Sequence, residues 1–207
     1  MSLSFNNDKA VKAYAAKTEL FQIEKELFNE HLHGRVLDLG CGCGRTTRHI
    51  HNMGYDVVGV DIAPLLIESA QSLHPDIKFK VGDATHLEYL DESFDTVVFS
   101  FNGLDYLYPL ENRLQALNEI RRVLKPGGCF MYSSHEQPLI KKLPIRRRLR
   151  IHRFDPPYYR EITKHGIHVT YYGLVSCNSR HLKQAGFKDV LVCDPMGHAW
   201  RYYVAWV

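Results

Sequence analysis

The sequence predicts a doubly wound α/β domain, in which a mostly parallel sheet carries helices on both faces. Three observations support this fold class. Short β-branched or apolar runs alternate with helical stretches over the first two thirds of the chain, a glycine-rich turn follows the first such run, and 207 residues suffice for one sizeable core but not for two. Strands that alternate with helices in this way form parallel sheets whose two faces are both covered.

The expected elements follow one another in a regular order. A helical region over residues 8–33 comes first, and the strands expected after it cover residues 35–39, 55–60, 77–81, 94–101 and 129–133. The helices between them cover residues 45–52, 64–73 and 110–124. Pro64 supports one helix start, because a proline in the first turn has no N–H group to satisfy.

The last part of the chain differs from this alternation. A helix over residues 179–185 ends at Gly186, and two runs with strand character follow at 187–193 and 198–207. Their short connection around residues 194–197 suits an antiparallel hairpin. We therefore expect one antiparallel strand at the end of an otherwise parallel sheet.

Composition indicates a soluble, cytoplasmic protein. The chain has five cysteines, an odd number, and no secretory signal precedes them, which favours a reducing compartment. No run of about 18 apolar residues is present, so neither a spanning helix nor a membrane partner is expected. The net charge of +3 gives no general reason to expect a nucleic-acid partner.

The glycine-rich turn predicts a nucleoside ligand. Gly40, Gly42 and Gly44 stand at alternate positions between the first strand and the helix that follows it. Without Cβ atoms, this backbone can turn sharply and approach a ligand closely. Asp61 closes the second strand, where a carboxylate can accept hydrogen bonds from both ribose hydroxyls. The alternatives are a plain turn and a helix cap at Asp61.

The charge of the turn separates two classes of nucleoside ligand. A dinucleotide fold spaces its glycines as G-x-G-x-x-G and keeps negative charge away, because a pyrophosphate lies over the turn. Here Asp38 stands two residues before Gly40, where a carboxylate would repel pyrophosphate but attract the ammonium of a methionyl group, directly or through water. A dinucleotide-dependent oxidoreductase is therefore the disfavoured alternative.

Four short motifs follow one another along the chain. They are DLGCGCGR at 38–45, GVDI at 59–62, GDA at 82–84 and LKPGG at 124–128. Each is weak alone, but in this order they are specific, and over about residues 14–134 the chain resembles the class I S-adenosylmethionine-dependent methyltransferases, in particular their small-molecule group. The resemblance implies a Rossmann-like sheet of seven strands, mostly parallel with one antiparallel C-terminal strand. It also implies S-adenosyl-L-methionine as cofactor and S-adenosyl-L-homocysteine as product.

The resemblance further implies roles for individual residues. Asp61 would bind the ribose, Ile62 would pack against the adenine, and Asp83 would accept a hydrogen bond from its amino group. The Ala84 N–H would donate to the adenine ring, and Tyr14 would either close over the cofactor or lie on a helix surface. The implied cofactor-binding set is Tyr14, Asp38, Gly40, Cys41, Gly42, Gly44, Asp61, Ile62, Asp83, Ala84, Ser100 and Phe101, with Ser100 and Phe101 on the methionyl side.

The sequence does not identify a catalytic base. Displacement at a sulfonium needs no protonated leaving group, so positioning can supply much of the acceleration, whereas an amine or hydroxyl acceptor must lose a proton. His135, after the fifth strand, and Asp105 and Tyr106, after the fourth, stand where acceptor-side residues would lie, although each also suits a packing role. The histidine and cysteine spacings do not match a zinc site, so no metal is expected.

Residues 135–166 fit none of the alternation and carry nine lysines and arginines against three acidic residues. We expect this segment to form a basic lid, with Arg146, Arg147, Arg148 and Arg150 holding a small anionic acceptor. A solvated helix face is the alternative reading of these charges. An RNA methyltransferase is disfavoured, because one short cluster is a small electrostatic footprint for RNA. A non-catalytic S-adenosylmethionine-binding partner subunit and an unassigned oligomeric state also stay open.

Overall fold

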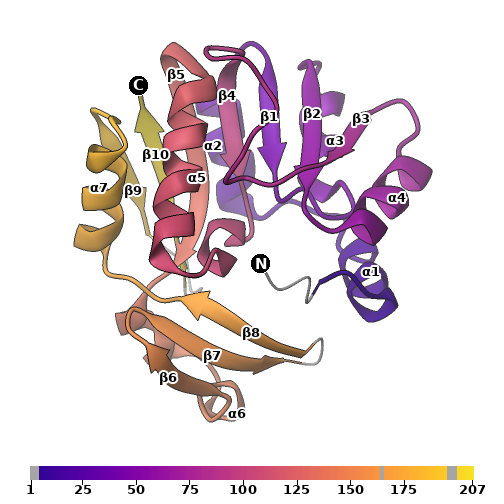
Figure 1. Cartoon of the computed structure of the whole chain (residues 1–207). Helices are drawn as coiled ribbons and strands as arrows, with labels where there is room; N and C mark the ends of the chain where they lie inside the picture. The colour runs from indigo at the N-terminus through magenta and orange to yellow at the C-terminus, as the bar shows by residue number, and fades with distance from the viewer. Residues whose placement is uncertain (1–4, 164–165, 195–199) are drawn as a thin grey trace.

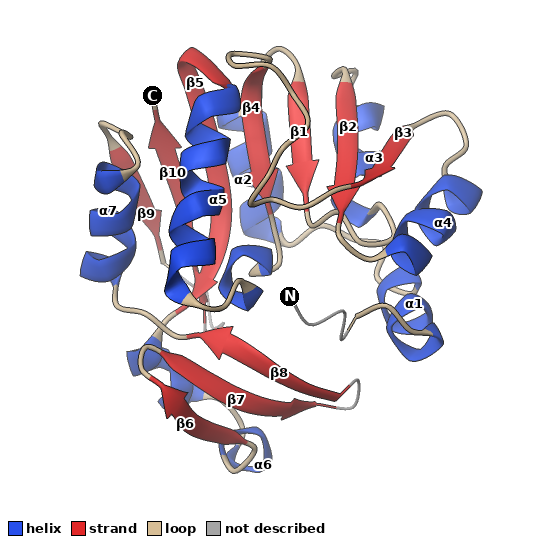
Figure 2. Ribbon diagram, in the orientation of Figure 1, coloured by secondary structure: helices blue, strands red, loops and turns tan. Residues whose placement is uncertain are grey.

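A computed structural model describes residues 5–163, 166–194 and 200–207 of the chain. Seven strands form its main sheet, in the order β3-β2-β1-β4-β5-β10-β9 (Figures 1 and 2). Their bounds are β1 (Val36–Leu39), β2 (Val57–Asp61), β3 (Lys78–Val81), β4 (Phe94–Phe99), β5 (Leu124–His135), β9 (Val190–Cys193) and β10 (Trp200–Trp206). The predicted fold class is therefore confirmed.

Strand direction also follows the prediction. The pairs from β3 through β5 are parallel, whereas β10 runs antiparallel to both β5 and β9. The chain starts in the middle of the sheet at β1, proceeds outward to β3, and then returns to β4 on the other side of β1. Ligands of doubly wound sheets bind beyond the carboxyl ends of the strands at such a reversal.

Helices cover both faces of this sheet. In Figure 1, α5 (Leu110–Val123) and α7 (Val175–Gln184) lie in front of it, and α2 (Gln22–His31) and α3 (Arg45–Asn52) lie behind. Each side has its own apolar cluster, one with Leu117 and Ile120 of α5 and the other with Phe28 of α2 and Ile50 of α3. Because β1 and β2 are buried along their whole length, their sequences are almost continuously apolar.

The remaining helices flank the carboxyl edge of β2 and β3. α4 (Pro64–Leu73) contacts these two strands and packs through Ile67 and Ala70 beside Phe79. α1 (Asp8–Ala15) contacts α4 and begins at Asn7, whose side chain accepts a hydrogen bond from the Ala10 N–H at 3.0 Å. No helix within the described part of the chain combines the length and the apolarity needed to cross a bilayer.

The structure adds regular elements to the basic segment, which the sequence prediction left without any. The segment begins with η2 (Gln137–Lys142) and α6 (Ile145–Arg148) and continues as a separate antiparallel sheet of β6 (Ile151–Asp155), β7 (Tyr158–Thr163) and β8 (Gly166–Tyr171). We use "lid" for this whole unit, residues 137–171. Figure 1 shows it below the carboxyl edge of the main sheet, with α6 at the far end.

Several predicted boundaries are wrong, each for a physical reason. The single helical region over 8–33 is two helices, because Asn7 caps α1 and Glu24 restarts the helix by accepting a hydrogen bond from the Phe21 N–H at 2.9 Å. β5 extends to His135 because β10 pairs with it throughout, from Cys129 to His135. The hairpin connection expected around 194–197 falls largely on residues 195–199, which lie outside the described residues.

Candidate functional site

A cavity of about 410 Å³ lies at the carboxyl ends of β1, β2 and β4, where the strand order reverses. One wall comes from the main sheet and includes Gly40, Gly42, Asp61, Ile62, Ala84, Ser100 and Phe101. The other wall comes from the segment after β4 and from β8, and includes Tyr106, Leu107, Tyr108, Ile167, His168 and Val169. Phe5 and Tyr14, from the N-terminal segment, complete the lining. The main sheet and the lid thus share one enclosed space.

The glycine turn leaves room for a ligand at one position and forms a close contact at another. Gly40 and Gly42 both have positive φ angles, 61° and 56°. A Cβ on Gly40 would lie 2.6 Å from the Phe99 ring, so the backbone there packs too tightly for a side chain. A Cβ on Gly42 would meet only the Tyr14 ring, at 3.8 Å, and would point into open space. Gly42 therefore exposes backbone to the cavity.

Asp61 lies at the end of β2 with its carboxylate held by backbone donors. The N–H groups of Gly42 and Ala63 each donate to it at 2.9 Å. Burial raises the pKa of this carboxyl, while the hydrogen bonds from Ala63 and Gly42 oppose the shift by stabilising the charged form. The side chain thus links the glycine turn to β2 and lines the cavity, which places a rigid acceptor there.

Asp38 is not among the residues that line the cavity, although the sequence placed it beside a ligand ammonium. It is buried beneath the glycine turn, where the Thr47 hydroxyl donates to its carboxylate at 2.6 Å. Burial raises the pKa of Asp38 to about 7, and the Thr47 bond only partly offsets this shift. The carboxyl is therefore substantially protonated at neutral pH, and its expected electrostatic effect on the ligand is weaker than a fixed charge would give.

The residues predicted for the adenine end divide into two groups. Ile62 and Ala84 line the cavity, but Asp83 does not, and one of its carboxylate oxygens accepts hydrogen bonds from both donors of Thr85 at 2.8 Å. The Cys41 side chain points away, into a cluster with Phe79, and its N–H donates to the Val60 carbonyl at 3.1 Å. Gly44 is the N-cap of α3. The last two residues therefore shape the turn without lining the cavity.

Ser100 and Phe101, predicted for the methionyl side, line the cavity directly after β4. Phe101 has a φ of 55°, a left-handed conformation that is strained for an aromatic residue and concentrates at functional sites. Its ring contacts Tyr14 edge-on at 6.3 Å and stacks on Phe21 at 5.8 Å. Burial, with smaller effects from the Asp61 and Cys43 charges, raises the pKa of Tyr14 to about 12, so its hydroxyl is neutral at physiological pH.

Of the three acceptor-side candidates, only Tyr106 lines the cavity. Burial raises the pKa of its hydroxyl well above the usual value, which makes the phenolate inaccessible near neutral pH. Asp105 and His135 instead belong to a buried polar network. The Asp105 carboxylate accepts from Arg113 at 2.9 Å, from the Ser134 hydroxyl at 2.7 Å, and from the His135 N–H at 2.6 Å. It also lies 2.9 Å from the His135 Nδ1.

The four arginines predicted to hold the acceptor lie away from the cavity. Arg147 is directed at Glu161, with its Nε 2.8 Å from the carboxylate, whereas Arg146, Arg148 and Arg150 are exposed on and beside α6. No lysine or arginine is among the described residues that line the cavity. The prediction of an anionic acceptor held by these arginines therefore has no geometric support.

The sequence analysis missed the part of the wall that β8 contributes. Ile167, His168 and Val169 belong to this strand, and Phe5 stacks on the His168 ring at 4.5 Å. The signal was present, because residues 166–171 read Gly-Ile-His-Val-Thr-Tyr, a β-branched run with alternating character. The predicted lid ended at residue 166, and the run that follows it received no assignment.

Comparisons with known proteins agree with the resemblance to methyltransferases. A family model described as "Methyltransferase domain" matches residues 36–128. A demethylmenaquinone methyltransferase of Lactiplantibacillus plantarum is 33% identical over 178 residues, covering 75% of this chain and 70% of the relative. Another of that name, from Paenarthrobacter aurescens, is 35% identical over 115 residues, which are 56% of this chain and 43% of the relative. This chain thus covers less than half of the second protein.

Solved structures support the fold. A structure described as a SAM-dependent methyltransferase from Methanosarcina mazei superposes with a TM-score of 0.75 at 22% identity, covering 91% of this chain and 98% of that one. At this identity, the likeness concerns the architecture alone.

Proposed function

We propose that this chain, which belongs to the class I S-adenosylmethionine-dependent methyltransferases, transfers a methyl group to a small, uncharged acceptor that carries a flat, largely apolar ring. The single observation that carries the proposal is the shared cavity. Its main-sheet wall holds most of the residues expected to bind the cofactor, and the opposite wall, from the segment after β4 and from β8, is mainly aromatic and aliphatic. Such a wall suits ring stacking and apolar contact but supplies no cation for an acidic group.

The residues present fit the cofactor. The open backbone at Gly42, the carboxylate of Asp61 and the apolar side chain of Ile62 offer a close approach, a hydrogen-bond acceptor and a packing surface to a nucleoside. Ser100 and Phe101 lie where the methionyl side is expected. When bound, S-adenosylmethionine supplies an electrophilic methyl group on a sulfonium sulfur. The neutral, apolar surroundings would exclude water from that region.

On the acceptor side, we assign the role of general base to His168. An acceptor hydroxyl must lose its proton as the methyl group arrives, and imidazole is the side chain suited to take that proton near neutral pH. His168 lines the cavity, whereas His135 does not. Tyr106 and Tyr108 would hold the acceptor ring between the lid and the main sheet by edge or face contacts.

The proposed reaction is tested by release of S-adenosylhomocysteine. Because the relatives above are named demethylmenaquinone methyltransferases, the reduced, hydroquinone form of demethylmenaquinone, which carries hydroxyl groups, is the first acceptor to supply, followed by simple phenols and naphthols. Aromatic carboxylates and unmodified RNA test the two alternatives, an anionic acceptor and an RNA acceptor. Turnover with the carboxylates or RNA alone would contradict the proposal. Cofactor binding without turnover on any acceptor, but with stimulation of a second methyltransferase, would favour a partner subunit.

Substituting Asp61 with alanine is expected to weaken binding of S-adenosylhomocysteine by about 1 to 3 kcal/mol, the usual loss when hydrogen bonds to a charged group disappear. Titration calorimetry measures the change, and Asp56→Ala is the comparison, since Asp56 is exposed at the opposite end of β2. Circular dichroism checks that the fold is retained. Equal affinity of folded Asp61→Ala and the wild-type protein would show that Asp61 does not bind the ribose.

A further inference from the structure

The outer surface of the lid carries an excess of unpaired positive charge. Seven lysines and arginines are exposed there, namely Lys141, Lys142, Arg146, Arg148, Arg150, Arg153 and Arg160. Within the described residues, no ion pair engages Arg146, Arg148 or Arg150. Of the lid's acidic residues, Glu161 is buried and paired with Arg147, which leaves Asp155 as the exposed one.

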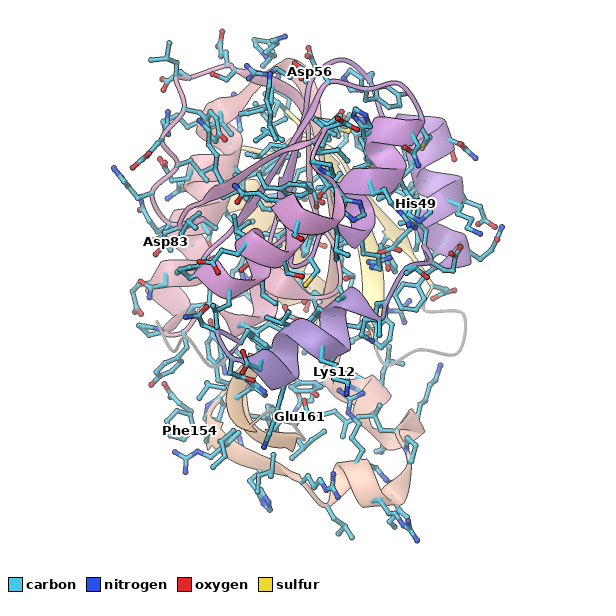
Figure 3. The ribbon with its side chains drawn as sticks, turned by 90° about the vertical axis from the view of Figure 1, so that its right-hand side faces the viewer. Lys12, His49, Asp56, Asp83, Phe154 and Glu161 are labelled. Atoms are coloured by element: carbon cyan, nitrogen blue, oxygen red, sulfur yellow. The ribbon has the colours of Figure 1, made fainter. Side chains whose placement is uncertain are left out.

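Exposed apolar side chains lie among these charges. Ile145 and Leu149 are 63% and 72% exposed and share one turn of α6, closed by a 3.0 Å hydrogen bond from the Leu149 N–H to the Ile145 carbonyl. Arg147, midway between them, points back to Glu161, so the two apolar side chains point outward. Figure 3 shows Glu161 within the lid and Phe154, 42% exposed, at its margin.

A second exposed apolar pair lies on the β7–β8 hairpin. Ile162 of β7 and Ile167 of β8 are direct cross-strand partners, 44% and 58% exposed. Direct partners project from the same face of a sheet, and Ile167 lines the cavity. This pair therefore adds exposed apolar area to the lid on the face that borders the cavity.

We propose that the outer surface of the lid docks on an anionic lipid bilayer. Arginines and lysines that flank outward-pointing isoleucine and leucine side chains are the combination that binds such an interface, because the charges meet lipid phosphates while the apolar groups enter the headgroup boundary. RNA would match the charges but would leave Ile145 and Leu149 in water. The contact is peripheral and needs no spanning helix.

Docking through the lid would bring the protein to the membrane, where apolar acceptors concentrate. This advantage rests on the proposed function, but the docking itself does not. Binding to lipid can therefore be measured without cofactor or acceptor, and its failure would leave the methyltransferase proposal intact.

The experiment is vesicle sedimentation of the full chain at 0.1 M salt. Vesicles of phosphatidylcholine with one third phosphatidylglycerol should bind the protein, and pure phosphatidylcholine should bind it at least tenfold more weakly. The triple variant Arg146→Glu, Arg148→Glu and Arg150→Glu should bind with a partition coefficient about a hundredfold lower. Each basic residue near an anionic surface contributes about fivefold to binding, and the three contributions multiply. The matched control replaces three exposed lysines outside the lid, Lys78, Lys183 and Lys188, with glutamate. Its partition coefficient should fall less than threefold.

The apolar contribution is tested separately. Ile145→Ser with Leu149→Ser should lower the partition coefficient about tenfold or more, because two side chains no longer enter the boundary. The matched control is Leu73→Ser with Leu90→Ser, two exposed leucines outside the lid, which should bind as the wild type does. Circular dichroism and calorimetry with S-adenosylhomocysteine confirm that each variant is folded.

Three results would overturn the docking proposal. The first is no binding to phosphatidylglycerol vesicles, and the second is an equal loss in the lid variants and their controls. The third is tight, salt-sensitive binding to a single-stranded RNA that the serine variant keeps while lipid binding is absent, which would identify the lid as an RNA surface.

Discussion

The free energy of unfolding of the Asp105→Asn variant is expected to be about 3 to 5 kcal/mol lower than that of the wild-type protein. Asp105 and Arg113 are both fully buried, with their side chains 2.9 Å apart, so the substitution leaves a guanidinium charge without its carboxylate in the interior. Burial is the largest single effect and lowers the pKa of Arg113, but Asp105 together with three nearby tyrosines outweighs it, and the pKa is raised. A guanidinium keeps its proton at neutral pH in proteins, so the arginine cannot escape the penalty by becoming neutral when Asp105 is lost.

Arg113 makes further contacts that connect several elements of the fold. Arg113 also donates to the Leu104 carbonyl at 2.9 Å and to Asn178 at 2.7 Å, and its guanidinium lies 4.0 Å from the centre of the Tyr171 ring. These contacts join α5, α7 and the lid to the segment after β4. Loss of the carboxylate should thus loosen the region that supports the lid wall of the cavity.

Chemical denaturation followed by circular dichroism measures the change, and for a chain of this length it corresponds to a fall in melting temperature of about 6 to 20 °C. Asp91→Asn is the control, because the Asp91 side chain is 75% exposed in its ion pair with Arg122 and surface pairs contribute about 0 to 1 kcal/mol. The double variant Asp105→Asn with Arg113→Met should be less destabilised than the sum of the single changes. A loss below 1 kcal/mol for Asp105→Asn would show that solvent reaches the network.

The parts of the fold that local sequence patterns encode were predictable. The strands β1, β2, β4 and β5 contain apolar or β-branched runs, β3 alternates lysine with Phe79 and Val81, and the turns between the strands carry glycine or proline. The places of the glycine turn and of Asp61 were also predictable, because each directly follows or closes a predicted strand, β1 and β2 respectively. Motif order and strand order together place the main-sheet wall of the cavity, which we propose binds the cofactor.

A lid over residues 135–166 was predicted, but the small sheet within it was not, because the burial of its aromatic residues depends on contacts distant in sequence. The Tyr158 hydroxyl donates to the Leu107 carbonyl at 2.6 Å, and the Tyr171 ring centre lies 4.0 Å from the Arg113 guanidinium. In sequence, they are aromatic residues in or after a basic stretch, which is typical of an exposed loop. The four arginines were assigned to the acceptor by charge, but Arg147 pairs with Glu161, and the other three are exposed.

Asp38 shows a second limit of sequence reasoning. Its position before the glycine turn was read correctly, but its surroundings depend on Thr47, nine residues later on α3. A one-dimensional pattern does not say whether a carboxylate at a strand end faces the ligand or the helix beneath the turn. Here the helix provides the donor, and burial brings the pKa of Asp38 to about 7.

The lid and the cofactor wall together suggest a division of roles in the proposed reaction. The main sheet is rigid at the cavity, since the carboxylate of Asp61 is fixed by two backbone donors. The acceptor wall instead belongs to a separate small sheet, held to the main domain by Tyr158, Tyr171 and the Asp105 network. In the proposed reaction, the cofactor site can thus remain constant while changes in the lid alter which acceptor is used. A substitution in the lid wall should therefore change the rate of methyl transfer without changing cofactor binding.

Replacing His168 with asparagine is expected to lower kcat by about 10²- to 10⁴-fold with an acceptor hydroxyl, the range associated with loss of a positioned general base. His168 lines the cavity on β8, whereas Asp61 and the glycine turn lie on the opposite wall, so binding of S-adenosylhomocysteine should stay within twofold of wild type. His152→Asn is the matched control, because His152 is exposed on β6 of the same small sheet and should leave kcat unchanged.

The pH dependence separates proton transfer from a packing role of His168. The wild-type rate should fall at acid pH as the imidazole takes up a proton and can no longer act as a base, and this acid limb should be absent from His168→Asn. Added imidazole should partly restore the His168→Ala variant, since a free base can occupy the space left by the side chain. A folded His168→Asn protein whose kcat lies within threefold of wild type, with the acid limb retained, would show that the acceptor proton leaves by another route.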